Sequence, residues 1–180
     1  NKKILRKKYG FDNKKLILYY GHFNKFKGVE YLISSMNYLD NTKLLMIPSK
    51  NSNKNKYDKL IKKEDLNVNI LNYNVNIVDY INLVDAVVLP YPDLTSTEAN
   101  PSCLLETLSC KTPVITTNIK EIKELLSENF HNFLANPKDS KNLAKKINMV
   151  FSKQYNTSLI EEGYSITKEF NIKLIAKKHL

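Results

Sequence analysis

The sequence predicts an α/β domain, a Rossmann-like three-layer fold in which about six parallel strands carry helices on both faces. Short apolar segments alternate along the chain with segments of helical periodicity, which is the pattern of a parallel sheet with crossover helices. The first strand-like segment, residues 16–20, is apolar throughout, as expected of a strand buried on both faces. A length of 180 residues, 42% of them hydrophobic, suffices for one domain with a closed core.

Strands and helices are expected to alternate in the first half of the chain. The wholly apolar segment LILYY, which ends at Gly21, is the first strand, and apolar residues at helical spacing from Val29 to Leu39 predict the helix that follows. A second strand stops at Pro48, and a basic helix precedes the third strand. The expected strands are 16–20, 43–47 and 68–71, and the expected helices are 29–39 and around 56–63.

The alternation continues in the second half. DAVVL is the most strand-like segment, and Pro90 and Pro92 terminate it because proline lacks the N–H that a sheet ladder needs. Asp139 or Ser140 caps a later helix. The apolar face of that helix comprises Leu143, Ile147, Val150 and Phe151. The expected strands are 85–89, 113–116 and a short one near 132–135, and the expected helices are 77–84, 101–110, 119–126 and one or two closing helices over 159–180.

Residues 1–180 are expected to form a single domain, with a hinge-like start over 1–14 and closing helices within 155–180. Right-handed crossovers in a parallel sheet point to the strand order 3-2-1-4-5-6. Ligands bind to such sheets beyond the carboxyl ends of the strands where the order reverses. The first and fourth strands flank that point, which directs attention to the loops 21–28 and 91–101.

The formal net charge of +10 admits three kinds of anionic partner: nucleic acid, a membrane surface or a small substrate. Nucleic acid is disfavoured, because aromatic and basic residues are not interleaved within one strand pair. No apolar run reaches the roughly 20 residues of a membrane span, so a cytoplasmic domain is expected, with peripheral contact at the inner membrane face left open. The chain begins at Asn1 and is interpreted as a piece excised from a longer protein.

Cysteine and histidine usage predicts neither a disulfide nor a metal site. Cys103 and Cys110 are separated by about two turns of a predicted helix, which is too far for a disulfide. His22, His131 and His179 lack metal-ligand spacing, and the chain has no C-x-x-C pair. Reduced thiols in a cytosolic protein are therefore expected.

The loop 21–28, GHFNKFKG, has features of a phosphate-binding turn. Gly21 and Gly28 are two of the four glycines in the chain, and they enclose His22 and Lys27. Glycine lets a backbone approach a phosphate closely, and Lys27 adds a positive charge at a helix entrance that is already positive. The loop matches neither the Walker pattern nor G-x-G-x-x-G. By itself it is equally compatible with a strand-to-helix turn that carries a solvated lysine.

The loop 91–101, YPDLTSTEANP, is the stronger indication of a site. Asn100 is a good helix N-cap, and Pro101 suits the first helical turn. The free N–H groups at the start of this helix should face the crevice. Because proline has no N–H, the donors available to an anion or a sugar hydroxyl are the amides near Asn100, Ser102 and Cys103.

Two glutamates, Glu98 before this helix and Glu106 on its second turn, admit several roles. An acid–base pair of the hydrolase kind needs a defined separation across one bond. Placement of one glutamate before the helix and one inside it instead favours separate contacts with an extended ligand, Glu106 with a ribose diol and Glu98 with the sugar or the reacting centre. The alternative is that the helix dipole merely favours carboxylates there. Glu106 lies in the apolar segment CLLETL, where an idle charge is costly, and this favours a ligand role.

Residues 98–106, EANPSCLLE, resemble the E-x7-E motif of the large retaining GT-B glycosyltransferase family that includes glycogen synthases and sucrose synthases. GHFNKFKG resembles that family's G-R-x-x-x-x-K-G loop, and residues 112–115 resemble its G-x-P-V-I strand. The similarity covers nearly the whole chain and corresponds to the C-terminal domain of the family. The chain departs from the family at His22, a weaker and pH-dependent cation in place of arginine, at Lys111 in place of glycine, and at residues 48–49 in place of a glycine-rich turn.

The resemblance implies that Lys27 contacts the diphosphate of a UDP- or GDP-linked sugar, that Glu106 holds its ribose, and that Glu98 lies beside the transferred sugar as the catalytic residue. Tyr73 and Asn74 are expected near the base. The resemblance further implies transfer with retention to a saccharide or lipid-linked acceptor, with no cofactor and no required metal. The acceptor-binding N-terminal domain of the same protein is absent from this chain, so the isolated half should bind nucleotide weakly and catalyse nothing.

Two alternatives stay open. A GT-B nucleotide-sugar epimerase would need no acceptor, so the products of the full-length protein distinguish it from a transferase. A non-catalytic basic domain that docks on anionic surfaces would bind any polyanion in a salt-dependent manner.

Overall fold

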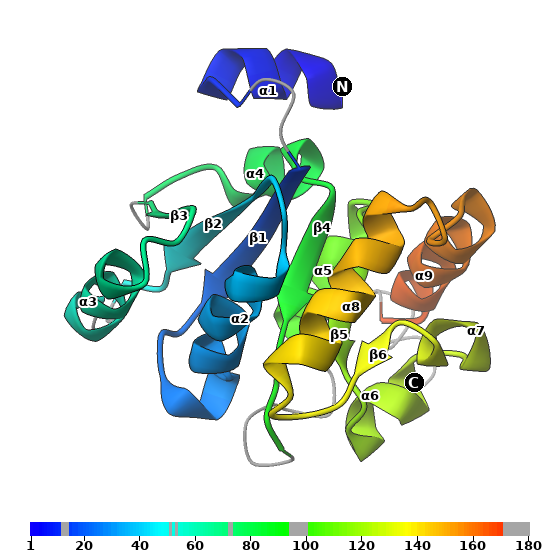
Figure 1. The fold of residues 1–180 in the computed structure, drawn as a ribbon. Helices are drawn as coiled ribbons and strands as arrows, with labels where there is room; N and C mark the ends of the chain where they lie inside the picture. Colours follow the sequence, from blue (N-terminus) through cyan, green and yellow to red (C-terminus); the bar gives the residue numbers. More distant parts are fainter. Residues whose placement is uncertain (12–14, 51, 53, 72–73, 94–100, 171–180) are drawn as a thin grey trace.

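In a computed structural model of the protein, six parallel strands form one sheet in the order β3-β2-β1-β4-β5-β6 within the described part of the chain (Figure 1). The described residues are 1–11, 15–50, 52, 54–71, 74–93 and 101–170. The strands are β1 (Lys15–Gly21), β2 (Thr42–Pro48), β3 (Val68–Ile70), β4 (Ala86–Leu89), β5 (Val114–Thr117) and β6 (Leu134–Ala135). The predicted class and strand order are confirmed.

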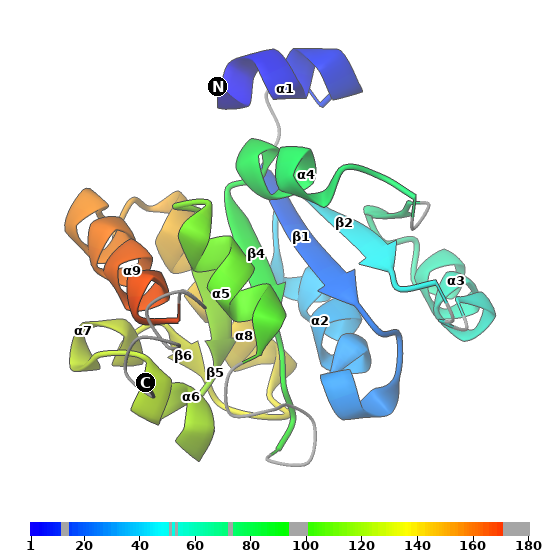
Figure 2. The ribbon, with the colours of Figure 1, turned by 180° about the vertical axis from the view of Figure 1, so that it is seen from behind.

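Helices cover both faces of this sheet. On the face turned to the viewer in Figure 1, α2 (Val29–Ser35) and α8 (Ser140–Phe151) lie side by side. On the face seen in Figure 2 lie α4 (Ile77–Leu83) and α5 (Ser102–Ser109), and α9 (Thr157–Glu169) packs against α5. The other described helices are α1 (Lys2–Tyr9), α3 (Asn55–Lys63), α6 (Lys120–Leu125) and α7 (Glu128–His131), with 3-10 turns η1 (Lys25–Lys27) and η2 (Met36–Tyr38).

The central strands are buried on both sides, which explains their uniformly apolar sequences. Every residue from Leu16 to Tyr20 in β1 is buried, and each fully buried aliphatic side chain contributes roughly 1.5–3 kcal/mol. The register pairs Gly21 with Pro48, so β1 and β2 end level with each other. The loops that follow the two strands therefore begin side by side.

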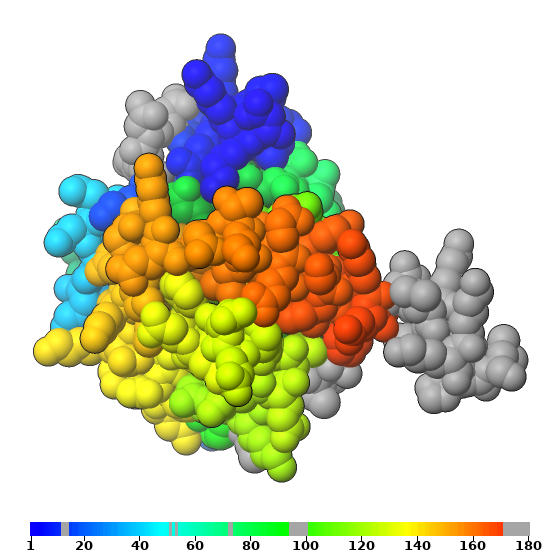
Figure 3. All heavy atoms as spheres, turned by 90° about the vertical axis from the view of Figure 1, so that its right-hand side faces the viewer, coloured from blue at the N-terminus to red at the C-terminus, as the bar shows by residue number. Residues whose placement is uncertain are grey.

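The sequence does not predict α1, which lies within the expected hinge-like start, because none of its residues is buried. Polar contacts and the packing of Leu5 and Tyr9 against the core hold it at one end of the molecule (Figure 3). Arg6 Nη2 lies 2.8 Å from Asp85 Oδ1, and the Tyr9 hydroxyl donates to Asp79 Oδ2 at 2.7 Å. The hydrogen bond from Tyr9 is the main reason that the pKa of Asp79 is lowered. The helix ends at Gly10, which has a left-handed φ of 71°.

The last turn of α8 packs against the core as predicted but is not fully buried. Val150 and Phe151 contact the core and are half-buried, because they also line an open hollow at the amino ends of the strands. Lys15 Nζ lies there, 5.0 Å from the centroid of the Phe151 ring. The cap at the other end of α8 is confirmed as Asp139, whose Oδ1 accepts the N–H of Asn142 at 2.8 Å. Of the expected closing helices, residues 171–180 lie outside the described residues.

Candidate functional site

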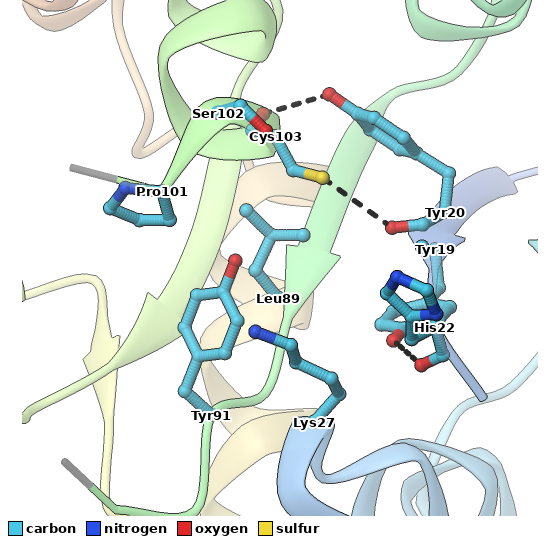
Figure 4. A pocket seen from close by; sticks show the side chains of 10 residues that line it. Tyr19, Tyr20, His22, Lys27, Leu89, Tyr91, Pro101, Ser102 and Cys103 are labelled. Atoms are coloured by element: carbon cyan, nitrogen blue, oxygen red, sulfur yellow. Dashed lines mark hydrogen bonds between the residues drawn. The ribbon is translucent and has the colours of Figure 1, made fainter. Parts of the chain in front are cut away.

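A cavity of about 260 Å³ opens at the carboxyl ends of β1 and β4, where the strand order reverses (Figure 4). Its walls come from the end of β1 with the turn after it, the end of β4, and the start of α5. The lining residues are Tyr19, Tyr20, Gly21, His22, Lys27, Leu89, Tyr91, Pro101, Ser102 and Cys103. The structure therefore brings together five residues predicted for the site, namely Gly21, His22, Lys27, Ser102 and Cys103.

The turn after β1 places Lys27 at this cavity. The side-chain oxygen of Asn24 accepts the N–H of Lys27 at 3.0 Å and caps η1. Gly28 follows with φ 71°, and a Cβ at this position would lie 1.8 Å from the carbonyl oxygen of Pro90. The turn thus rests on the backbone after β4 at a distance that only glycine allows. Lys27 Nζ lies 5.4 Å from the centroid of the Tyr91 ring, within range of a cation–π contact.

A second cavity of about 290 Å³ adjoins the first, because Tyr20, Gly21 and Cys103 line both. Glu106 lines this second cavity, on the other side of the shared wall from Lys27. Its remaining lining residues are Ile47, Pro48, Ser49, Val75 and Ile77. A cation and a carboxylate therefore lie on adjoining hollows that one extended ligand can occupy together.

Tyr20 connects the two cavities and is absent from the sequence prediction. Its hydroxyl lies 2.8 Å from the carbonyl oxygen of Cys103, 3.1 Å from Glu106 Oε2 and 3.3 Å from Thr107 Oγ1. Burial raises the pKa of Tyr20 far above its usual range, so the hydroxyl stays a neutral donor. One feature of the sequence could have indicated Tyr20. It carries a hydroxyl group at the end of a predicted buried strand, directly before Gly21.

We expect Tyr20→Phe to lower the free energy of unfolding by about 1 kcal/mol, because a buried hydrogen bond contributes roughly that much in net terms. Chemical denaturation measures the change. Tyr38→Phe is the matched control, since it removes a hydroxyl from a tyrosine that is 53% exposed, and it should change stability by less than about 0.5 kcal/mol. Equal losses in the two variants would contradict the stabilising role of the Tyr20 hydroxyl.

Cys103 lines both cavities but is not suited to nucleophilic chemistry. Burial, followed by the charge of Glu106, raises the pKa of the Cys103 thiol to about 11. The thiol is therefore protonated at neutral pH, and the thiolate is the reactive form of cysteine. Cys103 and Cys110 are both free, as the sequence predicts.

The helix α5 begins one residue later than predicted. Pro101 is its N-cap, with φ −66° and ψ 121°, and the carbonyl of Pro101 accepts the N–H of Leu104 at 3.0 Å. The expectation that Asn100 caps this helix is therefore wrong. The fixed φ of proline suits an extended cap residue as well as a first-turn residue. Ser102 and Cys103 become the first helical residues, whose N–H groups have no intrahelical acceptor, and they border the first cavity.

Of the remaining predicted site residues, Asn74 alone lies in the described part of the chain. Glu98, Asn100 and Tyr73 lie outside the described residues, so the roles of Glu98 and Tyr73 stay predictions. Asn74 is exposed and lines neither cavity, whereas its neighbour Val75 lines the second.

The described residues contain no group of three or more His, Cys, Asp or Glu side chains that is placed to hold a metal ion. No helix within the described ranges is long and apolar enough to cross a membrane.

Comparison with protein families gives one match along most of the chain. The sequence model of the family described as "Glycosyl transferases group 1" matches residues 1–165. A comparison with curated protein sequences gives no significant match.

Solved structures with the same fold include several glycosyltransferases. HepE from Anabaena, in complex with UDP-glucose, superposes with a TM-score of 0.80 at 19% identity over 93% of this chain and 48% of that chain. A glycosyltransferase from Rickettsia africae has a TM-score of 0.83 at 22% identity over 99% of this chain and 49% of that one. Sucrose-phosphate synthase from Thermosynechococcus elongatus has a TM-score of 0.83 at 20% identity over 97% and 46%. The chain thus spans about half the length of these structures.

Proposed function

Because this chain belongs to the family of group 1 glycosyltransferases, we propose that it is the domain of a retaining glycosyltransferase that binds a nucleotide-diphosphate sugar. The observation that carries the proposal is the pair of adjoining cavities, with Lys27 on one and Glu106 on the other. A nucleotide sugar presents an anionic diphosphate and a ribose diol a few bonds apart. A cation and a carboxylate on either side of a shared wall match these two groups.

The first cavity suits the diphosphate. Lys27 supplies a positive charge, and the N–H groups of Ser102 and Cys103 open a helix whose N-terminal end favours anions. Ion pairing and hydrogen bonding to phosphate oxygens are strong, because the acceptor is charged. The diphosphate would therefore lie between the turn after β1 and the start of α5.

The second cavity suits the ribose. The Glu106 carboxylate can accept hydrogen bonds from both hydroxyls of a diol. The Tyr20 hydroxyl donates to Glu106 Oε2 and so helps to fix the position of this carboxylate. Pro48, Val75 and Ile77 give this cavity an apolar wall against which a nucleobase can pack. A uracil base is supported by the UDP-glucose bound to HepE, and titration with UDP, GDP and ADP decides the base.

The transferred sugar and the acceptor involve parts beyond these cavities. We assign Glu98 to the sugar, as the catalytic residue of a transfer that retains configuration. The acceptor, a saccharide or a lipid-linked saccharide, would bind an N-terminal domain of the same protein, in keeping with the half-length coverage of the related structures. This reaction needs no cofactor and would take place in the cytoplasm, with peripheral contact at the inner membrane face. The isolated chain would bind the donor without turnover.

The test is nucleotide affinity measured by calorimetry. We expect Glu106→Ala to weaken UDP binding about 10-fold, because it removes hydrogen bonds to a charged acceptor. Wild-type protein should lose a similar factor when UDP is replaced by 2′,3′-dideoxy-UDP, and the variant should not distinguish the two ligands. Glu169→Ala, at the exposed end of α9, is the control and should bind like wild type.

A second outcome bears on the proposal as a whole. If Glu106→Ala left UDP affinity unchanged while the protein bound heparin strongly and in a salt-dependent manner, the chain would be a basic docking domain instead. Heparin binding has to be measured beside UDP binding, because a protein with a net charge of +10 can bind polyanions through charge alone.

A further inference from the structure

His22 is joined to the loop after β2 by a chain of hydroxyl groups. His22 Nδ1 lies 2.7 Å from Ser49 Oγ, and Ser49 Oγ lies 2.9 Å from Ser52 Oγ. Ser52 Oγ in turn accepts the backbone N–H of Phe23 at 3.0 Å. This hydrogen-bonded series therefore starts at His22 and ends at Phe23, both in the turn after β1, and it passes through two serines of a neighbouring loop.

The backbone holds these two loops together independently of the side chains. The N–H of Ser49 donates to the carbonyl of Gly21 at 2.9 Å, and the N–H of Ser52 donates to the carbonyl of Ser49 at 3.0 Å. The His22 carbonyl accepts the hydroxyl of Tyr19 at 2.7 Å. The positions of the three side chains therefore follow from the level ends of β1 and β2.

The direction of the hydrogen bonds follows from the donor at one end. The N–H of Phe23 can only donate, so Ser52 Oγ is an acceptor there. If Ser52 then donates to Ser49, and Ser49 donates to Nδ1, every hydroxyl proton has a partner. In the opposite direction Ser52 would accept twice, and its own proton would have no acceptor among the described residues. The forward direction is favoured, because hydrogen bonds in one direction strengthen one another.

We propose that Ser49 and Ser52 are positioning residues that hold the neutral His22 ring in the tautomer with its proton on Nε2. His22 and Lys27 line the same cavity (Figure 4). With Nδ1 accepting from Ser49, the other ring nitrogen is an N–H donor for a phosphate oxygen. The opposite tautomer would present a lone pair to the same oxygen and repel it. The ligand in this inference rests on the proposed function, whereas the tautomer does not.

This arrangement gives a role to two departures from the family pattern. An arginine in place of His22 would be a donor in every state, because its guanidinium has no acceptor atom. A histidine requires a second group that fixes which nitrogen donates. Ser49, which stands in place of a glycine-rich turn, supplies that group.

The tautomer can be measured without any ligand. Nitrogen-15 chemical shifts distinguish a protonated from an unprotonated ring nitrogen, and the chain has three histidines, so His22→Gln identifies the signals of His22. At a pH where the rings are neutral, we expect one tautomer with the proton on Nε2 in the wild-type protein. Ser49→Ala should convert it to a mixture, and Ser49→Thr, which keeps the hydroxyl, should restore it. A proton on Nδ1 in the wild type, or an unchanged tautomer in Ser49→Ala, would overturn the inference.

Measurements of nucleotide affinity test whether this positioning of His22 contributes to binding. We expect Ser49→Ala to weaken UDP binding about 3- to 10-fold, the size of one net hydrogen bond, with Ser49→Thr close to wild type. Ser165→Ala, which removes an exposed serine hydroxyl of α9, is the control. If the tautomer changes as expected while wild-type protein binds no nucleotide, the proposed function fails and the positioning of His22 stands. If nucleotide binds and Ser49→Ala does not weaken it, the positioning role in binding is refuted.

Discussion

Gly28→Ala is expected to lower the free energy of unfolding by about 3 kcal/mol, the largest stability effect of any substitution considered for this site. Two costs add at this position. An alanine at φ 71° occupies the left-handed region, which costs roughly 1–2 kcal/mol. Its Cβ would also lie 1.8 Å from the Pro90 carbonyl oxygen and 2.9 Å from the carbonyl carbon, so the turn after β1 must move away from the backbone after β4.

Gly10 offers a matched control for this prediction. It has the same φ of 71°, but a Cβ there would meet no atom within 4 Å. Gly10→Ala should therefore lower the free energy of unfolding only by the cost of the left-handed backbone conformation, roughly 1–2 kcal/mol. Chemical denaturation of the two variants isolates the steric contact with Pro90 as the difference between them. Equal destabilisation would show that the two loops do not touch.

The fold and the location of the site follow from local patterns in the sequence. LILYY and the segment AVVL (86–89) are uniformly apolar because β1 and β4 lie at the centre of the sheet and are buried on both faces. Right-handed crossovers then determine the strand order, and the reversal of that order determines which loops face the ligand. Lys27 and Glu106 could be identified on this basis because Lys27 lies just before one predicted helix and Glu106 lies on the second turn of another, each beside a loop that faces the ligand.

The contacts that the sequence does not predict depend on register between distant segments. The Tyr20 hydroxyl reaches Glu106 only because α5 begins beside the end of β1, and the two residues are far apart in the chain. Ser49 reaches His22 because Gly21 and Pro48 are paired across β1 and β2. Helix α1 is held by polar contacts with Asp79 and Asp85 and by the packing of Tyr9 on Tyr80, all of which join segments far apart in the sequence.

Lys27→Ala is expected to weaken UDP binding about 30- to 100-fold, the largest effect on affinity, because a hydrogen bond between charged groups contributes roughly 2–3 kcal/mol at a partly buried site. The loss should shrink as salt is added, since counterions screen the attraction between the ammonium and the diphosphate. Calorimetric titrations at low and high ionic strength measure both quantities. Uridine, which lacks phosphate, should bind the variant and the wild type alike.

Lys25 supplies the control within the same turn. It belongs to η1, as Lys27 does, but its ammonium lies 5.1 Å from the centroid of the Phe26 ring and does not line the cavity. Lys25→Ala removes the same charge a short distance away. If Lys27 acted only through the net charge of the protein, the two variants would therefore lose the same amount of UDP affinity. A much larger loss in Lys27→Ala would instead require direct contact with the diphosphate. Since Gly28 and Asn24 fix the turn that presents Lys27, that result would also explain why a glycine follows the lysine.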